Sequence, residues 1–253
     1  MQFGLCTISN KQQDVLAVLD AAAAAGYDGV EVWGGDHVGD GDEATCAAIR
    51  ECALANDLAI PVYGSYLRPG TAGFHDELSH ELRVADRLGA DLVRVWAGDQ
   101  EWQDRDDDHH DEVVSDLYEA TVLAADMGLE VTVEKHEGTL TNTTEGARRV
   151  VEGVDHEACG LNYQPLFGMA PAELVQEARA LAPLSNNVHV QAVPDRDTRD
   201  RCLLSDAFFD LEAVLGAFAD EGYAGYVNVE FVTDDLSYEE AIERDRAYLT
   251  SMR

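Results

Sequence analysis

The alternation of short strand patterns with helical patterns is the feature that most limits the fold of this chain. The patterns predict eight strands, at residues 2–8, 29–34, 59–64, 91–97, 129–135, 159–164, 187–192 and 225–232. They predict eight helices, at residues 12–26, 42–56, 75–89, 112–128, 144–153, 171–181, 210–222 and 237–251. Strands that alternate with helices form parallel sheets, and 253 residues suit a (β/α)8 barrel. We therefore expect an α/β protein, a (β/α)8 TIM barrel with a single domain over residues 1–253.

A doubly wound open sheet is the alternative fold for the same order of elements. It requires a glycine-rich phosphate-binding turn after an early strand. The segment Gly34–Gly39 is a poor version of such a turn, so the barrel is the preferred prediction.

The segment 129–144 starts as a strand and ends in a group of ionisable residues. Successive side chains of a strand face opposite ways, so Val131 and Val133 share one face. Thr132, Glu134 and His136 share the other. Burying a carboxylate and an imidazole without partners is costly, which indicates that this end of the strand uses them.

Five other strands repeat this division between an aliphatic face and a polar or aromatic face. Their polar or aromatic residues are Glu31 with Trp33, Arg94 with Trp96, Asn162 with Gln164, Asn187 with His189 and Gln191, and Asn228 with Glu230. In a barrel these side chains point towards the axis, and those near the carboxyl ends of the strands meet at one mouth. The sequence therefore predicts an active site at that mouth.

Glu134, His189 and Glu230 come from three strand ends around the predicted mouth. Two carboxylates and an imidazole suit a divalent cation such as Mn²⁺, Co²⁺ or Zn²⁺, and the oxygens suit Mg²⁺. The alternative is a network of buried salt bridges with Arg94 and Lys135 as the cationic partners. Because titratable groups converge from three strands, we favour a functional site.

The composition is strongly acidic, with 50 Asp and Glu residues against 17 Lys and Arg residues and a formal net charge of −33. Molar salt, with a Debye length of about 3 Å, would screen the self-repulsion of such a surface. We therefore expect a high-salt cytoplasm. The five cysteines are scattered, as expected for free thiols in a reducing compartment. A surface this negative disfavours nucleic acid as a partner, and no segment reaches transmembrane length.

Four segments together resemble the sugar isomerase/epimerase superfamily, whose members have a xylose-isomerase-like TIM barrel. They are Val133–Thr141, Val188–Val190, Val229–Phe231 and Asp91–Gly98. That superfamily also contains endonuclease-IV-type enzymes and 3-dehydroshikimate dehydratases. The resemblance covers essentially the whole chain.

The resemblance implies metal ligands after strands five and six and on strands seven and eight. It assigns these roles to Glu134, Gln164, His189 and Glu230. The family typically has an aspartate where this chain has Gln164, and an amide oxygen brings no charge. We therefore expect weaker or altered metal binding, with Gln191 on the face of His189 as a possible substitute ligand.

The resemblance also implies proton transfer next to a carbonyl of a small sugar-like substrate, through an enediolate. Glu134 and Glu230 would act as acid and base, with His136 or Lys135 as a further acid or base. Arg94 would hold a substrate oxygen or carboxylate.

Further candidate contacts with the substrate come from the mouth of the predicted barrel. They are Gln191 beside His189, Trp96 as a stacking surface for a sugar ring, and Arg201 as a loop residue that can bind an anionic group.

Three other functions are compatible with the resemblance. A lyase similar to 3-dehydroshikimate dehydratase shares the first proton abstraction and then expels a hydroxyl. A barrel that only binds a sugar-like ligand is the alternative that Gln164 favours. An endonuclease of the same superfamily is disfavoured, because it would need a basic groove and more histidines at the metal site.

Overall fold

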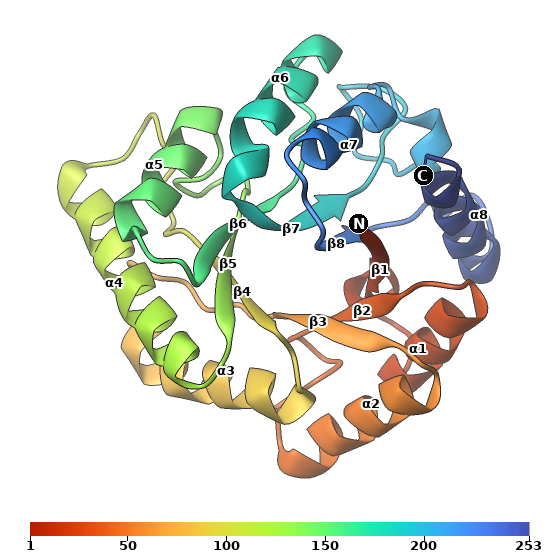
Figure 1. Ribbon diagram of the computed structural model, residues 1–253, viewed down its shortest axis with the longest axis horizontal. Helices are drawn as coiled ribbons and strands as arrows, with labels where there is room; N and C mark the ends of the chain where they lie inside the picture. Colours follow the sequence, from red (N-terminus) through yellow and green to blue (C-terminus); the bar gives the residue numbers. More distant parts are fainter. Residues whose placement is uncertain (253) are drawn as a thin grey trace.

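Eight parallel strands close into a barrel in the computed structural model, which describes residues 1–252 (Figure 1). The strands are β1 Gln2–Cys6, β2 Gly29–Trp33, β3 Ala59–Gly64, β4 Leu92–Trp96, β5 Glu130–Glu134, β6 Cys159–Tyr163, β7 Ser185–Val190 and β8 Tyr226–Val229. Each strand pairs with its neighbours in chain order, and β8 pairs with β1 to close the ring. The predicted (β/α)8 TIM barrel is confirmed.

Eight helices surround the strands as an outer ring (Figure 1). They are α1 Val15–Ala24, α2 Glu43–Ala55, α3 Phe74–Leu88, α4 Asp107–Asp126, α5 Thr144–Val154, α6 Pro171–Leu181, α7 Leu211–Asp220 and α8 Tyr238–Ser251. Short 3₁₀ helices occur at Thr7–Asn10, Ala182–Leu184 and Leu204–Asp206. No helix within residues 1–252 has the length and apolar character needed to cross a membrane.

The start of α4 differs from the expected helix at residues 112–128. The helix begins at Asp107, because the side chain of Asp106 accepts a hydrogen bond from the backbone N–H of His109 at 2.7 Å. Asp107 and Asp108 then occupy the first turn, where negative charge is favourable. The acidic run therefore begins the helix instead of preceding it.

The aliphatic faces of the strands form the layer between barrel and helices. Val131, Val133, Val188 and Val190 are fully buried there, as the alternation pattern predicts. The opposite faces point into the barrel. The inward positions of β5 and β7 therefore carry the side chains that build the site.

Three asparagines lie inside the barrel below the mouth. Asn228 donates to Asn187 at 2.9 Å, and Asn187 donates to Asn162 at 3.1 Å. Gly4 leaves room for this chain of amides, since a Cβ at that position would lie 1.9 Å from Oδ1 of Asn228. These hydrogen bonds connect β6, β7 and β8 directly beneath the predicted site.

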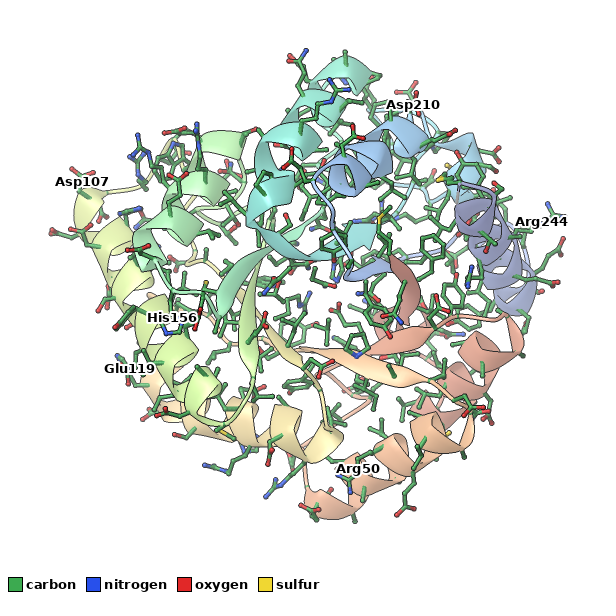
Figure 2. The ribbon with its side chains drawn as sticks, in the orientation of Figure 1. Arg50, Asp107, Glu119, His156, Asp210 and Arg244 are labelled. Atoms are coloured by element: carbon green, nitrogen blue, oxygen red, sulfur yellow. The ribbon has the colours of Figure 1, made fainter. Side chains whose placement is uncertain are left out.

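The charged side chains of the outer surface project away from the barrel. Asp107 and Glu119 on α4, Arg50 on α2, and Arg244 on α8 lie at the rim of the molecule (Figure 2). All four are exposed. The acidic excess is thus displayed to solvent on the helices, separately from the buried acids of the barrel.

Candidate active site

His189 lies at the centre of a group of buried acids at the carboxyl end of the barrel. Its Nδ1 is 3.4 Å from Oε1 of Glu134 and 3.9 Å from Oε1 of Glu230. Its Nε2 is 2.6 Å from Oε2 of Glu31. His189 comes from β7, Glu31 from β2, Glu134 from the end of β5, and Glu230 directly follows β8. The structure thus brings the predicted trio together and adds Glu31.

Arg94 on β4 is the cationic partner of two of these acids. Its Nη1 donates to Oε2 of Glu134 at 2.9 Å, and its Nε is 3.7 Å from Oε1 of Glu31. Its Nη2 donates to the backbone carbonyl of Ser65 at 3.3 Å. Gly64 leaves the space for this arrangement, because a Cβ there would lie 2.9 Å from Oε1 of Glu31. Arg94 therefore holds Glu134 in place from below.

Burial and neighbouring charges separate the pKa values of the acids. Burial raises the pKa of Glu230 to about 7. Burial also opposes ionisation of Glu134, but Arg94 and His189 outweigh it and lower that pKa to about 2. In the same way the attraction between Glu31 and His189 overcomes burial, lowering the pKa of the acid and raising that of the imidazole. Glu134 and Glu31 are therefore ionised at neutral pH.

Several polar atoms at the mouth are buried and have no hydrogen-bond partner among residues 1–252. Those that can ligate a metal include Oε1 of Glu134, Nδ1 of His189 and Oε1 of Gln191. Ligand atoms of Glu134, His189 and Glu230 all lie within 4.8 Å of one another. Buried polar atoms without partners are rare and costly, and oxygen and nitrogen donors at this spacing suit a divalent cation. The donor set therefore fits a metal ion.

The surroundings of the donor set also match a divalent cation. With all three carboxylates ionised and His189 neutral, the state that a bound cation favours, Glu31, Glu134, Glu230 and the guanidinium of Arg94 together carry two net negative charges. Without a metal the raised pKa of His189 keeps its imidazole protonated. A cation that displaced the proton from Nδ1 would leave Nε2 donating its hydrogen bond to Glu31. Metal-binding histidines commonly donate their other N–H to a carboxylate in this way.

A second set of donors uses the opposite side of the same imidazole. Sγ of Cys6 is 3.7 Å from Nε2 of His189, and Cys6, Glu31 and His189 are close enough to share an ion. Burial raises the pKa of Cys6 to about 12, so its sulfur stays a thiol and a poor ligand. Because Nε2 and Glu31 already bond to each other, the Nδ1 side is the better metal site.

The two glutamines at the mouth have different environments. Nε2 of Gln191 donates to Oε1 of Gln164 at 3.2 Å and to Oε2 of Glu230 at 2.9 Å. The amide oxygen of Gln164 therefore already accepts a hydrogen bond, whereas that of Gln191 is free. Of the two residues, Gln191 offers the more available oxygen ligand.

A cavity of about 430 Å³ opens directly above this group. Glu230, Gln191 and Gln164 form its floor, and His136 and Arg201 lie in its walls. A small-molecule substrate in this space would contact the acid of β8 and both amides. The cavity thus brings together five of the residues predicted from the sequence.

His136 and Trp96 form a stacked pair at the mouth. Their ring centroids are 4.6 Å apart with an interplanar angle of 18°. Nδ1 of His136 lies 2.5 Å from the backbone carbonyl of Glu137, so it carries the proton and leaves Nε2 free. Trp96 therefore supports His136, which in turn borders the cavity.

Arg94 borders a smaller hollow beside the main cavity, together with Cys6, Trp33 and Glu230. Its guanidinium is occupied by two carboxylates and a carbonyl, but one edge remains next to this hollow. The hollow measures only about 10 Å³, so a contact between Arg94 and a substrate oxygen would require it to widen and remains a prediction.

Lys135 occupies a different place from the one expected of a substrate contact. Its Nζ is fully buried and lies 3.3 Å from Oε2 of Glu177 on α6. The other carboxylate oxygen of Glu177 accepts a hydrogen bond from Thr144. Lys135 points outward with Val133, because neighbouring residues of a strand alternate between faces. The expected substrate or proton-transfer role does not fit this placement, and the residue instead connects β5 to α6.

Glu31 is the main site residue that the sequence interpretation did not assign a role. Its alternation with Val30 and Val32 already placed it inside the barrel, which was the available signal. Its contact with His189 spans 158 positions of the chain, and no local pattern reports such a pairing. Cys6 was missed for the same reason.

An eight-stranded barrel with acids, amides and a histidine at its carboxyl mouth defines a TIM-barrel protein with its site in the usual place. Residues 19–252 match the xylose isomerase-like TIM barrel family. The chain belongs to this family.

Several characterised proteins are similar to this chain. A 3-dehydroshikimate dehydratase of Bacillus anthracis is 24% identical over 206 residues, which are 78% of this chain and 74% of that protein. The structure of a D-allulose 3-epimerase from Methylomonas sp. has a TM-score of 0.80 and 13% identity, covering 100% of this chain and 98% of that one. The structure of IolI protein with a bound zinc atom has a TM-score of 0.83 and 18% identity, covering 100% and 98%. The structural likenesses concern the fold.

Proposed function

We propose that this protein is a divalent-metal-dependent isomerase or epimerase of a sugar or sugar derivative. The observation that carries the proposal is the convergence of Glu134 and Glu230 on Nδ1 of His189 beneath a cavity. The reaction would start with removal of a proton next to a carbonyl and proceed through an enediolate.

Glu134, His189 and Glu230 would hold the metal, with an amide oxygen of Gln191 or Gln164 as a further ligand. The free atoms Oε1 of Glu134, Nδ1 of His189 and Oε1 of Gln191 support this assignment. The chemistry that such an ion supplies is polarisation of the substrate carbonyl and its adjacent hydroxyl. Mn²⁺, Mg²⁺, Co²⁺ and Zn²⁺ are the candidates, and the zinc-bound relative supports a metal of this kind.

The residues that would move protons are the two glutamates and His136. Glu134 and Glu230 reach His189 from β5 and β8. Glu230 lines the cavity and would meet the substrate directly, whereas Glu134 lies deeper, on the same imidazole. His136 borders the same cavity with a free Nε2, so it can serve as a further acid or base. Arg94 would keep Glu134 ionised and oriented through its 2.9 Å contact.

A lyase that removes water from a polyhydroxy ketone is the second candidate. Its reaction begins with the same proton abstraction as that of an isomerase or epimerase, and the 24% identical relative is a 3-dehydroshikimate dehydratase. In this reaction the acid that does not abstract the proton would protonate the departing hydroxyl. A barrel that binds a sugar-like ligand without turnover is the outcome if Gln164 has abolished metal binding.

Two experiments test the proposed function, one on the metal site and one on the reaction. Metal content after purification in high salt, and thermal shifts on adding Mn²⁺, Mg²⁺, Co²⁺ or Zn²⁺, test the site. Absence of both stoichiometric metal and any thermal shift would refute the enzyme proposal. Solvent-deuterium exchange into D-allulose, and loss of water from 3-dehydroshikimate, then separate epimerase from lyase.

Replacement of Glu134 by Gln tests its role in either reaction. We expect exchange or turnover to be abolished, because the variant cannot accept the proton. Glu81→Gln is the matched control, since Glu81 is a half-buried carboxylate on α3 that accepts a hydrogen bond from Tyr63 away from the mouth. Undiminished exchange in the Glu134 variant would remove that residue from catalysis.

We also infer a high-salt, cytoplasmic setting from the acidic surface. The chain has 50 acidic and 17 basic residues, and acidic side chains such as those of Asp107 and Glu119 are exposed on the outer helices (Figure 2). Such a surface repels itself at low salt and is screened at high salt.

A further inference from the structure

Arg201 is a half-buried arginine without a hydrogen bond or ion pair. Within residues 1–252 the arginines that lack both are Arg83, Arg179 and Arg201, and the first two are exposed to solvent. Arg201 is instead held between aromatic rings, with Cζ 5.2 Å from the ring centroid of Phe231 and 5.6 Å from that of Phe167. Its position is therefore fixed by rings that leave its hydrogen-bond donors unused.

Arg201 lies at the candidate active site. The residue lines the 430 Å³ cavity together with Gln191 and Glu230. Its aromatic supports come from the same cavity wall, Phe231 directly after Glu230 and Phe167 after β6. A substrate held at the floor would therefore lie within reach of the guanidinium.

The other two arginines of the same loop are already engaged. Nη2 of Arg199 is 3.1 Å from Oε2 of Glu137, and Nη2 of Arg196 donates to the backbone carbonyl of Gly168 at 2.6 Å. These contacts fix the loop that covers the cavity. Arg201 remains as the cation of the loop that is free to bind a ligand.

A free guanidinium in this position has a physical cost. Burial lowers the pKa of Arg201, and the nearby charge of Glu230 only partly compensates. Aromatic faces stabilise a cation but accept few hydrogen bonds, so no protein group accepts from the N–H donors of Arg201, and those that reach the cavity are available to a ligand. A planar anion on the open edge would satisfy them, and a carboxylate does so through two parallel hydrogen bonds.

The charged residues that line the cavity are balanced in number. They are three arginines and three acids, Arg196, Arg199, Arg201, Glu137, Asp197 and Glu230. Arg196 and Arg199 already have partners, so one unpaired guanidinium beside the acid Glu230 suits a monoanion better than a dianion. Its planar fork also matches a carboxylate, and the surroundings therefore favour a carboxylate over a phosphate.

We propose that Arg201 binds a carboxylate of the substrate, and that the substrate is a sugar acid or related polyhydroxy carbonyl acid instead of a neutral sugar. This inference rests on the proposed function, because it places the carboxylate in the cavity above Glu230 and Gln191. It adds a substrate class that the metal site by itself does not define.

Three probes that share one ring skeleton test the proposal. They are D-glucuronate, D-glucose and D-glucose 6-phosphate, titrated calorimetrically into the protein with and without added Mn²⁺ at fixed salt. We expect D-glucuronate to bind more tightly than the other two. Arg201→Gln should weaken its binding by roughly 10- to 100-fold, as expected for the loss of hydrogen bonds to a charged group.

Two further variants sharpen the result. Arg201→Lys keeps the charge but loses the planar fork, so it should restore only part of the affinity. Arg83→Gln removes an equal charge from the exposed face of α3 and should leave binding unchanged. A loss of affinity in both Arg201→Gln and Arg83→Gln would reduce the effect to net charge and overturn the assignment.

The remaining outcomes separate this proposal from the proposed function. Equal binding of D-glucuronate by wild type and Arg201→Gln, no detectable binding up to its solubility, or preference for the phosphate would each overturn the carboxylate assignment. Metal binding and deuterium exchange are measured independently, so their failure refutes the enzyme without affecting this test. Binding of D-glucuronate that depends on Arg201, in a protein that shows no deuterium exchange, would support the anion site in a barrel that binds its ligand without turnover.

Discussion

The contact between Glu31 and His189 offers a sharp test of how the site is built. Oε2 of Glu31 accepts a hydrogen bond from Nε2 of His189 at 2.6 Å, and both side chains are buried. This contact orients the ring so that Nδ1 faces Glu134 and Glu230, and with a metal on Nδ1 it would keep the remaining proton on Nε2. Replacing Glu31 with Gln keeps the size of the side chain but removes its charge and weakens this contact.

The expected effect on metal affinity follows from the contacts that are lost. Removal of a carboxylate that orients a metal-binding histidine typically costs 10- to 100-fold in affinity, or roughly 1.4–2.7 kcal/mol. The variant also removes one negative charge from the mouth, which acts in the same direction. The protein should still fold, because Arg94 keeps its 2.9 Å contact with Glu134.

The assay is competition for Zn²⁺ or Mn²⁺ against a chromophoric chelator in molar KCl. Glu81→Gln is again the control, since it removes a carboxylate that accepts a 2.7 Å hydrogen bond from Tyr63 outside the mouth. We expect weaker metal binding in the Glu31 variant and unchanged binding in the control. An unchanged affinity in the Glu31 variant, or an equal loss in both, would refute the reasoning.

The remaining predictions concern the amide at the mouth, a buried acid and the surface. Gln164→Asp adds a charged ligand and should raise metal affinity by about tenfold, measured by the same competition; a decrease would mean that Gln164 serves its neighbour Gln191 and not the metal. Burial raises the pKa of Asp245 to about 7, so the folded protein binds this proton more tightly than the unfolded chain does. The contribution of this proton to the free energy of unfolding is therefore fully present below about pH 4 and is lost as the pH rises to about 7. Asp245→Asn can still accept the 2.8 Å hydrogen bond from the backbone of Leu204. We expect this variant to be more stable than wild type above pH 7 by at most roughly 4 kcal/mol, and the difference should vanish below about pH 4. Denaturant unfolding at both pH values measures the difference, and a difference that does not depend on pH would contradict the prediction. The melting temperature should rise steeply between low and molar KCl, and equal stability at both salt concentrations would exclude adaptation to high salt.

The positions of Glu134, His189 and Glu230 could be predicted from the sequence because two periodic rules determine them. Strand alternation places each side chain on the inner face, and the parallel barrel brings the carboxyl ends of all strands to one mouth. The same alternation sends Lys135 outward to Glu177. Lys135 is adjacent to Glu134 in sequence, but the direction of its side chain places it in the layer between the barrel and α6.

The parts of the site that escaped prediction depend on side-chain conformations and on loops. Glu31 meets His189 only because both reach the barrel axis at the same depth, which the sequence spacing does not encode. Arg201 itself was expected as a contact for an anionic group, but its placement between Phe167 and Phe231 was not, because the three residues come from loops whose course has no periodicity. Such contacts follow from tertiary packing, so they become visible only when the fold is known.

The acids of this protein fall into two populations that should respond differently to salt. Exposed acids such as Asp107 and Glu119 (Figure 2) interact through solvent, where a Debye length of about 3 Å at molar salt cancels their repulsion. Glu31 and Glu134 are buried in direct contact with Arg94 or His189, and salt screens such contacts far less. The loss of metal affinity in Glu31→Gln should therefore be nearly the same at moderate and molar KCl, while the stability of the fold changes strongly over that range. A metal site that weakened in parallel with the fold would instead indicate that the surface charge, and not the arrangement around His189, attracts the ion.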